Sequence, residues 1–474
     1  MTTTAERAAE VDDPSVAPGR VRSVIPLLTR LHFYAGILVA PFLAVAAITG
    51  LLFAFSPQLD RLIYDRELHV ARVGPGLPHA LSEQVAAART AHPVGTFAAV
   101  LPAAAPDATT RVVFSRPELG ERQHTVYIDP YTLEVRGTLT TWYDETPLTT
   151  WLDDLHRNLH LGAAGRVYSE LAASWLWVLV GGGLIIWLRR QWRRRGRTRA
   201  IVFADLAAAK GVRRTRGWHA ATGVWLAVGL LFLSATGLTW SRWAGGNFGL
   251  ALDALNAHRP SVDAALPGGA TPAAPGGHHG GGGAVDGADP ANVDAVLHAA
   301  VGAGLTGPMT IAAPAEPGAA WTVTGNDRVW PVNFDAIAVD PASGNVTARS
   351  DFAEWPLLAQ LSKLGVQAHM GFLFGFANQL LLAALAIGLL CVIVWAYRMW
   401  WQRRPTRADR RAPLGTPPAR GTWRRVPRPV LAVGVIVTAA IGWALPEFGV
   451  TLAAFLVVDA IAGVVRRRRI APGA

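Results

Sequence analysis

The chain contains little cysteine and little charge. Of its 474 residues, one is Cys and 16% are Asp, Glu, Lys or Arg. A single cysteine excludes a disulfide framework, a Cys-ligated iron–sulfur cluster and a thiolate zinc site. No glycine cluster lies between a predicted strand and a helix, so neither NAD nor FAD is expected to bind. We also find no nucleophile with an acid–base dyad.

Hydrophobic residues make up 51% of the chain, and they lie in long runs. A membrane-spanning helix needs about 20 consecutive, mainly apolar residues. Four segments meet this requirement, and two shorter ones separated by Pro446 and Glu447 form a C-terminal hairpin. The sequence therefore predicts an α-helical membrane bundle of about six transmembrane helices.

The basic residues, which give a net charge of +11, flank the apolar runs. They concentrate at 189–216 and 398–428, whereas the two long segments between spans lean acidic. Because basic loops stay in the cytoplasm, both termini are expected inside and the acidic segments outside. The charge therefore indicates orientation, and no nucleic-acid partner is expected. The predicted order is a cytoplasmic tail (1–30), a first span (31–55), a first outer module (56–166), a second span (167–188), a basic loop (189–217), a third span (218–241), a second outer module (242–368), a fourth span (369–401), a second basic loop (402–428), the hairpin (429–465) and a cytoplasmic tail (466–474).

Each outer segment has the pattern of a small α+β module. Short predicted strands flank an Asp-Pro turn at Asp129-Pro130 in the first module and at Asp340-Pro341 in the second. A Gly/Pro-rich loop at 267–287 contains His278 and His279, for which a disordered tract is favoured over a metal site.

The chain also repeats itself. The first span reads His32-x3-Gly36-x12-Thr49-Gly50, and the third reads His219-x3-Gly223-x12-Thr236-Gly237. His160 and His369 each precede a Gly near the start of the second and fourth spans. This order predicts an internal two-fold repeat, with a pseudo-twofold axis along the membrane normal.

The repeat pairs His32 with His219 near the cytoplasm and His160 with His369 near the outer face. Ionisable residues at membrane depth suggest function. Two facing neutral imidazoles suit the axial positions of haem b, so two bis-His haems are expected. Zinc is a weaker alternative.

Four glycines recur at matched positions relative to the histidines of the repeat. Gly36 and Gly223 lie one helical turn from their histidines, and Gly50 and Gly237 lie five turns away. Each is expected to leave room for a flat macrocycle, and close helix packing is the alternative. His156, four residues before His160, remains open as an alternative ligand, a supporting residue, part of a substrate surface or an interfacial hydrogen-bonding residue.

The motifs resemble those of the PepSY-associated transmembrane family. The resemblance is carried by Val126–Pro130, Leu155–Gly162, Trp218–Gly223 and His369–Gly375, and it covers roughly residues 25–402. It implies PepSY-like outer modules, a bacterial inner-membrane location and His32, His160, His219 and His369 as haem ligands. Members include iron-regulated membrane proteins and ferric-siderophore reductases.

The favoured function is a haem-dependent oxidoreductase that reduces ferric, siderophore-bound iron outside. The electron donor would be quinol or a cytosolic reductase. The alternative is a membrane-anchored binding or regulatory protein that binds a peptide or inhibits a protease. That function would not need histidines within the membrane. The iron chemistry depends on the resemblance alone.

Overall fold

The computed structural model describes residues 24–192, 211–266, 289–402 and 426–470. The parts of the chain outside these ranges include the Gly/Pro-rich loop with His278 and His279 and most of the basic loops. Among the described residues, four helices are long and apolar enough to cross a membrane, and a bent pair makes a fifth span if it is counted as one. The protein is therefore a multi-pass membrane protein. These helices are α7 (Gly162–Trp192), α9 (Val212–Leu238), α13 (Gly375–Gln402) and α15 (Pro446–Ile470), with the bent pair α1 (Ile25–Leu38) and α2 (Ala40–Ala54).

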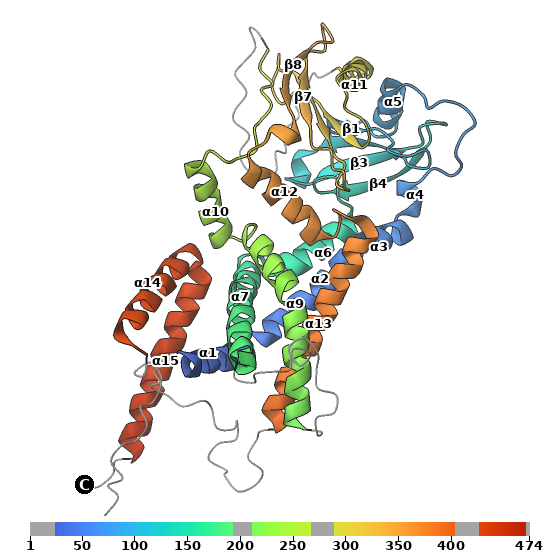
Figure 1. The fold of residues 1–474 in the computed structure, drawn as a ribbon. Coiled ribbons are helices and arrows are strands. Elements are labelled where there is room, and N and C mark those ends of the chain that lie inside the picture. Colours follow the sequence, from blue (N-terminus) through green and yellow to red (C-terminus); the bar gives the residue numbers. More distant parts are fainter. Residues whose placement is uncertain (1–23, 193–210, 267–288, 403–425, 471–474) are drawn as a thin grey trace, which may run out of the picture.

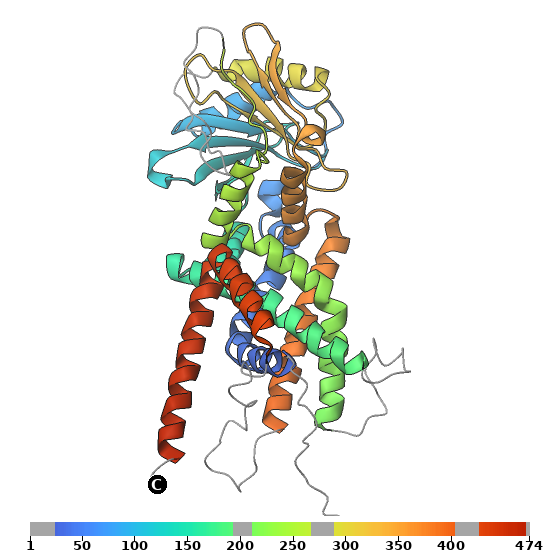
Figure 2. The ribbon, with the colours of Figure 1, turned by 60° about the vertical axis from the view of Figure 1, so that its left-hand side comes forward.

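The six predicted spans are not all present as predicted. The first half of the terminal hairpin is α14 (Arg428–Ala444), which has 17 residues and is shorter than a typical span. It lies beside α15 at the edge of the bundle (Figure 2). The first predicted span is also not one straight helix, because α1 and α2 meet at an angle of 56°.

Pro41 explains the bend. It lies in the first turn of α2 and has no N–H to donate to the carbonyl of Ile37, so the helical ladder is interrupted there. The hydroxyl of Tyr397 on α13 donates to that carbonyl instead, at 3.0 Å. A tertiary hydrogen bond thus satisfies the backbone group that the bend exposes.

A single sheet lies at one end of the bundle (Figure 1). It has eight antiparallel strands in the order β4-β3-β2-β1-β5-β6-β7-β8. The strands are β1 (Thr96–Leu101), β2 (Thr110–Ser115), β3 (Gln123–Ile128), β4 (Val135–Thr141), β5 (Met309–Ala312), β6 (Trp321–Gly325), β7 (Ala336–Val339) and β8 (Val346–Ser350).

The two outer modules are therefore joined, although the sequence predicted two separate ones. Strand β1 of the first module pairs with β5 of the second, with Ala99 opposite Ala312 and Val100 opposite Ile311. Each of these strands would otherwise leave a row of backbone groups unpaired at a sheet edge, and their pairing removes both edges. The strand order is symmetric about this pair.

The two faces of the sheet have different surroundings. Helices α5 (Leu81–Ala91) and α11 (Val293–Gly302) pack on one face around a fully buried core that includes Val126 and Ile128. Arg111 and Tyr127 are opposite each other in the β2–β3 ladder, and by the strand alternation they lie on the other face. That face is turned toward the bundle.

Short helices connect the bundle to the sheet. Figure 1 shows α3, α6 and α12 at this junction. The bounds are α3 (Ser56–Ile63), α4 (Asp65–Leu68), α6 (Pro147–Asn158), α10 (Trp243–Ala254) and α12 (Leu357–Met370), with short 3-10 turns at Pro117–Leu119, Pro290–Asn292 and Phe352–Glu354.

Candidate cofactor site: two histidine pairs

The first histidine pair lies in the bundle, away from the sheet. His32 on α1 and His219 on α9 face each other with ring centroids 6.5 Å apart and planes at 78°. This is the pair that the sequence repeat predicted. A Cβ added at Gly183 on α7 would lie 3.2 Å from the His32 ring, so the ring packs against a helix backbone that only glycine leaves open.

The ring of His219 is oriented by a backbone group. Its Nδ1 lies 3.0 Å from the carbonyl oxygen of Val392 on α13, to which Nδ1–H donates. This tautomer leaves Nε2 unprotonated and able to bind a metal. Nδ1 of His32 is buried and has no hydrogen-bond partner within the described part of the chain, although the Leu179 backbone approaches the ring.

The second pair lies where the bundle meets the sheet. His156 on α6 and His369 on α12 have ring centroids 6.5 Å apart and planes at 53°. Each is held by a threonine of a spanning helix. Nδ1 of His156 lies 2.9 Å from Oγ1 of Thr49, and Nδ1 of His369 lies 2.6 Å from Oγ1 of Thr236.

The threonines fix the tautomer of both rings. Thr49 donates its hydroxyl proton to the carbonyl of Val45 at 2.9 Å, and Thr236 donates to that of Phe232 at 2.8 Å. A hydroxyl has one proton, so each threonine oxygen accepts from the histidine Nδ1–H. In both rings Nε2 is then the unprotonated nitrogen. Both threonines belong to the sequence repeat, but the repeat by itself does not indicate this role.

The expected juxtaposition of His160 with His369 is not what the structure contains. Helix α6 ends at Asn158, and Leu159 and His160 have left-handed backbone conformations with φ of 53° and 56°. The exposed His160 ring lies 4.9 Å from that of Trp151. His156, four residues earlier and still helical, occupies the position opposite His369.

Of the four glycines predicted to border a macrocycle, two lie against histidine rings and two border open space. A Cβ at Gly50 would come within 3.0 Å of the His156 ring, and one at Gly237 within 3.5 Å of the His369 ring. These two glycines thus make room for imidazoles. Around Gly36 a Cβ would meet only Leu179 at 4.0 Å, and around Gly223 it would meet nothing within 4 Å, so both border open space.

Helix α9 connects the two pairs. It carries His219 near one end and Thr236 near the other, 17 residues later on an unbroken helix. At 1.5 Å per residue this separates them by about 26 Å. The five-turn spacing predicted from the sequence applies to α9. It does not apply to the first half of the chain, because the bend lies between His32 and Gly50.

The sequence that carries both histidine pairs matches the model of a known family. The profile of the PepSY-associated TM region matches residues 29–403. The chain belongs to the PepSY-associated transmembrane family. The match includes both histidine pairs and all eight strands of the sheet, and it ends before the α14–α15 hairpin. No curated protein matches the chain.

Each pair in this PepSY-associated protein has the spacing that one metal ion requires. With a nitrogen–metal bond of about 2 Å and a ring radius of about 1 Å, two imidazoles on opposite sides of an ion have centres roughly 6 Å apart. Both pairs have centroids at 6.5 Å. Within the described ranges no three His, Cys, Asp or Glu side chains form a metal-binding cluster, so each pair offers two protein ligands.

Proposed function

We propose that the protein is a haem-containing electron-transfer protein of the bacterial inner membrane. In this proposal His32 and His219 hold one haem b, and His156 and His369 hold a second. Electrons from a quinol or a cytosolic reductase would reduce ferric, siderophore-bound iron at the outer face. The observation that carries the proposal is the equal 6.5 Å spacing of the two pairs.

The residues around the pairs fit haem. A haem would take two ligands from the protein, and each histidine pair would supply both of them. The hydrogen bonds from Nδ1 to Val392, Thr49 and Thr236 leave Nε2 free in three of the four rings. The open space at Gly36 and Gly223 lies one helical turn from the inner histidines, where a flat ring would pass.

In this proposal the protein would orient the histidine ligands and surround them with apolar side chains. Haem iron, when bound, exchanges one electron at a time between its ferric and ferrous states. The helices keep the imidazoles at fixed distances, and apolar side chains of α1, α2, α7, α9 and α13 form the core of the bundle. Reduction suits iron release because hard, oxygen-rich chelators hold Fe(III) more tightly than Fe(II). The choice of iron as acceptor follows the family analogy.

Haem content tests the proposal. The purified protein is expected to show a Soret band that shifts on reduction with dithionite, and a stoichiometry of two haems per chain. His219→Ala is expected to lower this to about one, because one axial ligand of the inner pair is lost. The double variant with His32→Ala should lose no more than either single variant, since both residues serve one site.

Two outcomes would contradict the proposal. A colourless, fully folded protein would favour the alternative, a membrane-anchored binding or regulatory protein. One haem in the intact protein would contradict the two-site arrangement. Circular dichroism and thermal unfolding of each variant show whether the lost colour reflects a lost ligand or a misfolded chain.

The orientation is a separate prediction. Reporter tags inserted after Gly196 and Gly415, which lie outside the described residues, are expected in the cytoplasm because those loops are rich in arginine. Tags inserted within 267–287, also outside the described residues, are expected on the outer side. Paired alkaline phosphatase and green fluorescent protein fusions distinguish the two sides. An outer-side signal from either basic loop would overturn the orientation.

A further inference from the structure

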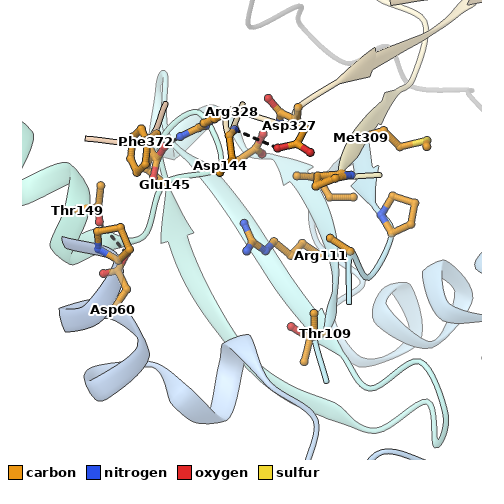
Figure 3. A pocket seen from close by; sticks show the side chains of 18 of the residues that line it. Asp60, Thr109, Arg111, Asp144, Glu145, Thr149, Met309, Asp327, Arg328 and Phe372 are labelled. Atoms are coloured by element: carbon orange, nitrogen blue, oxygen red, sulfur yellow. Dashed lines mark hydrogen bonds and ion pairs between the residues drawn. The ribbon is translucent and has the colours of Figure 1, made fainter. Parts of the chain in front are cut away.

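A cleft of about 410 Å³ separates the sheet from the bundle. Its walls come from both halves of the chain, with Arg111 of β2 and Asp60 of α3 from the first half and Arg328, after β6, from the second. Figure 3 shows the charged side chains around it. The volume is in the range of small-molecule sites, which lie preferentially at boundaries of this kind between structural units.

Most of the charges in the cleft are already paired within the protein. Asp60 accepts hydrogen bonds from the hydroxyl groups of Thr146 and Thr149, at 2.6 and 2.7 Å. Arg328 forms an ion pair with Glu145, and its guanidinium also lies 5.3 Å from the ring of Phe372. These contacts hold α3, α6 and the second half of the sheet together.

Asp327 is engaged as well. Its carboxylate accepts from the backbone N–H of Val329 at 3.0 Å, which fixes the turn that carries Arg328. The acidic groups Asp60, Glu145 and Asp327 therefore all have a partner.

Three polar side chains in or near the cleft form no hydrogen bond or close ion pair among the described residues. Arg111 extends into the space between the Asp60 and Arg328 walls in Figure 3 and forms no hydrogen bond or ion pair with its side chain. Asp144 also forms no hydrogen bond with its side chain, but the positive charges of Arg111 and Arg328 attract its carboxylate. The hydroxyl of Tyr127, which is opposite Arg111 in the β2–β3 ladder, is buried without a hydrogen-bond partner among the described residues. A guanidinium with free donors favours planar oxyanions, which it binds through two parallel hydrogen bonds.

The cleft is connected to the outer histidine pair by two short paths. Thr149, which lines the cleft, is seven residues before His156 on α6, so both lie on nearly the same helix face about 10 Å apart along the axis. Phe372, which also lines the cleft, follows His369 by three residues. A ligand in the cleft would therefore lie next to the outer pair.

We propose that this cleft is the binding site of the outer substrate and that it takes an anionic, oxygen-rich metal chelate, with Arg111 donating to the chelator oxygens. The assignment rests on the proposed function, for which it specifies where and through which residue the acceptor binds. Burial raises the pKa of the Asp144 carboxyl, which weakens the repulsion between this group and an anion.

Binding of a redox-inactive chelate tests this assignment without any electron transfer. Gallium(III) forms complexes shaped like those of iron(III) but is not reduced. The gallium complexes of a tris-catecholate and of citrate are expected to bind the full-length protein in isothermal titration calorimetry. Arg111→Gln should weaken this binding at least tenfold, because a charged hydrogen-bond donor is lost. Arg111→Lys should have an intermediate affinity, since it keeps the charge but loses the planar pair of donors.

Two control variants complete the test. Arg122→Gln removes an exposed arginine of the same module that does not line the cleft, and it is expected to bind normally. Asp144→Asn keeps the shape and removes a negative charge, so binding should be unchanged or tighter. Thermal unfolding shows whether each variant is folded.

The gallium-binding test and the haem test can fail independently of each other. Unchanged binding in Arg111→Gln, or no gallium complex bound by a protein that carries both haems, would overturn the cleft assignment and leave the haem proposal standing. Binding that depends on Arg111 in a protein without haem would support the cleft as a site and contradict the electron-transfer function.

Discussion

His156→Ala is expected to remove the outer haem and leave the inner one in place. The imidazole of His156 lies opposite that of His369 and is held by Thr49, so in the proposed haem site it would be the second histidine ligand. The inner pair is on other helices and should keep its ligands. Haem content should fall from about two to about one per chain, and a redox titration should lose one of its two steps.

His160→Ala is the matched control. The two histidines are four residues apart in the sequence, but the exposed His160 ring lies against Trp151 and does not face His369. Its removal should leave both haems and both redox steps. If His160→Ala lost the outer haem while His156→Ala kept it, the ligand assignment made from the structure would be wrong.

Gly50→Leu is expected to have a similarly large effect through a steric route. Even a Cβ at this position would come within 3.0 Å of the His156 ring, a distance that the ring can relieve only by moving. A leucine side chain would occupy the place of the imidazole and separate it from Thr49. The outer haem should be lost, while the helix should still insert, since leucine favours both helix and bilayer.

The second half of the chain provides a graded comparison. A Cβ at Gly237 would lie 3.5 Å from the His369 ring, which is an ordinary contact, so Gly237→Ala should be tolerated whereas Gly50→Ala should weaken the outer site. Gly237→Leu should remove the outer haem. Gly434→Leu is the control, because that glycine of α14 has open space around it.

The pattern of loss distinguishes this account from simple helix packing. If the glycines only allowed helices to approach one another, leucine at Gly50 or Gly237 would loosen the bundle. Both haem signals and the unfolding temperature would then fall together. Selective loss of the outer redox step, with the inner one unchanged, is the result that the two-haem proposal predicts. Equal loss of both would contradict it.

The sequence predicted the inner pair but not the outer one, and the reason is local. His156 and His160 are one helical turn apart, so both fit the pattern of a ligand on the same helix face. The choice depends on where α6 ends. The helix ends in a left-handed conformation at Leu159 and His160, and the nearest glycine that could mark the end, Gly162, comes only after both of them.

The sequence contains an indication of the bend in the first span, which is a proline inside the apolar run. Pro41 lies within a run of apolar residues long enough to span a membrane, so the hydropathy pattern predicts a single helix. Proline inside a helix causes a kink, but its size depends on what satisfies the freed carbonyl. Here that group is the hydroxyl of Tyr397, which is 360 residues away in the sequence.

The sequence by itself determined the properties that depend on local composition and order. These are the multi-pass membrane class, the family, the Asp-Pro turns and the occurrence of matched histidines in both halves. Tertiary structure alone decided that His156 and not His160 faces His369, that β1 and β5 join two modules into one sheet, and that Arg111 faces a cleft. Hydropathy and residue spacing indicate whether a whole segment is buried, exposed or within the membrane. These three outcomes depend instead on where a helix ends and on which distant surfaces meet.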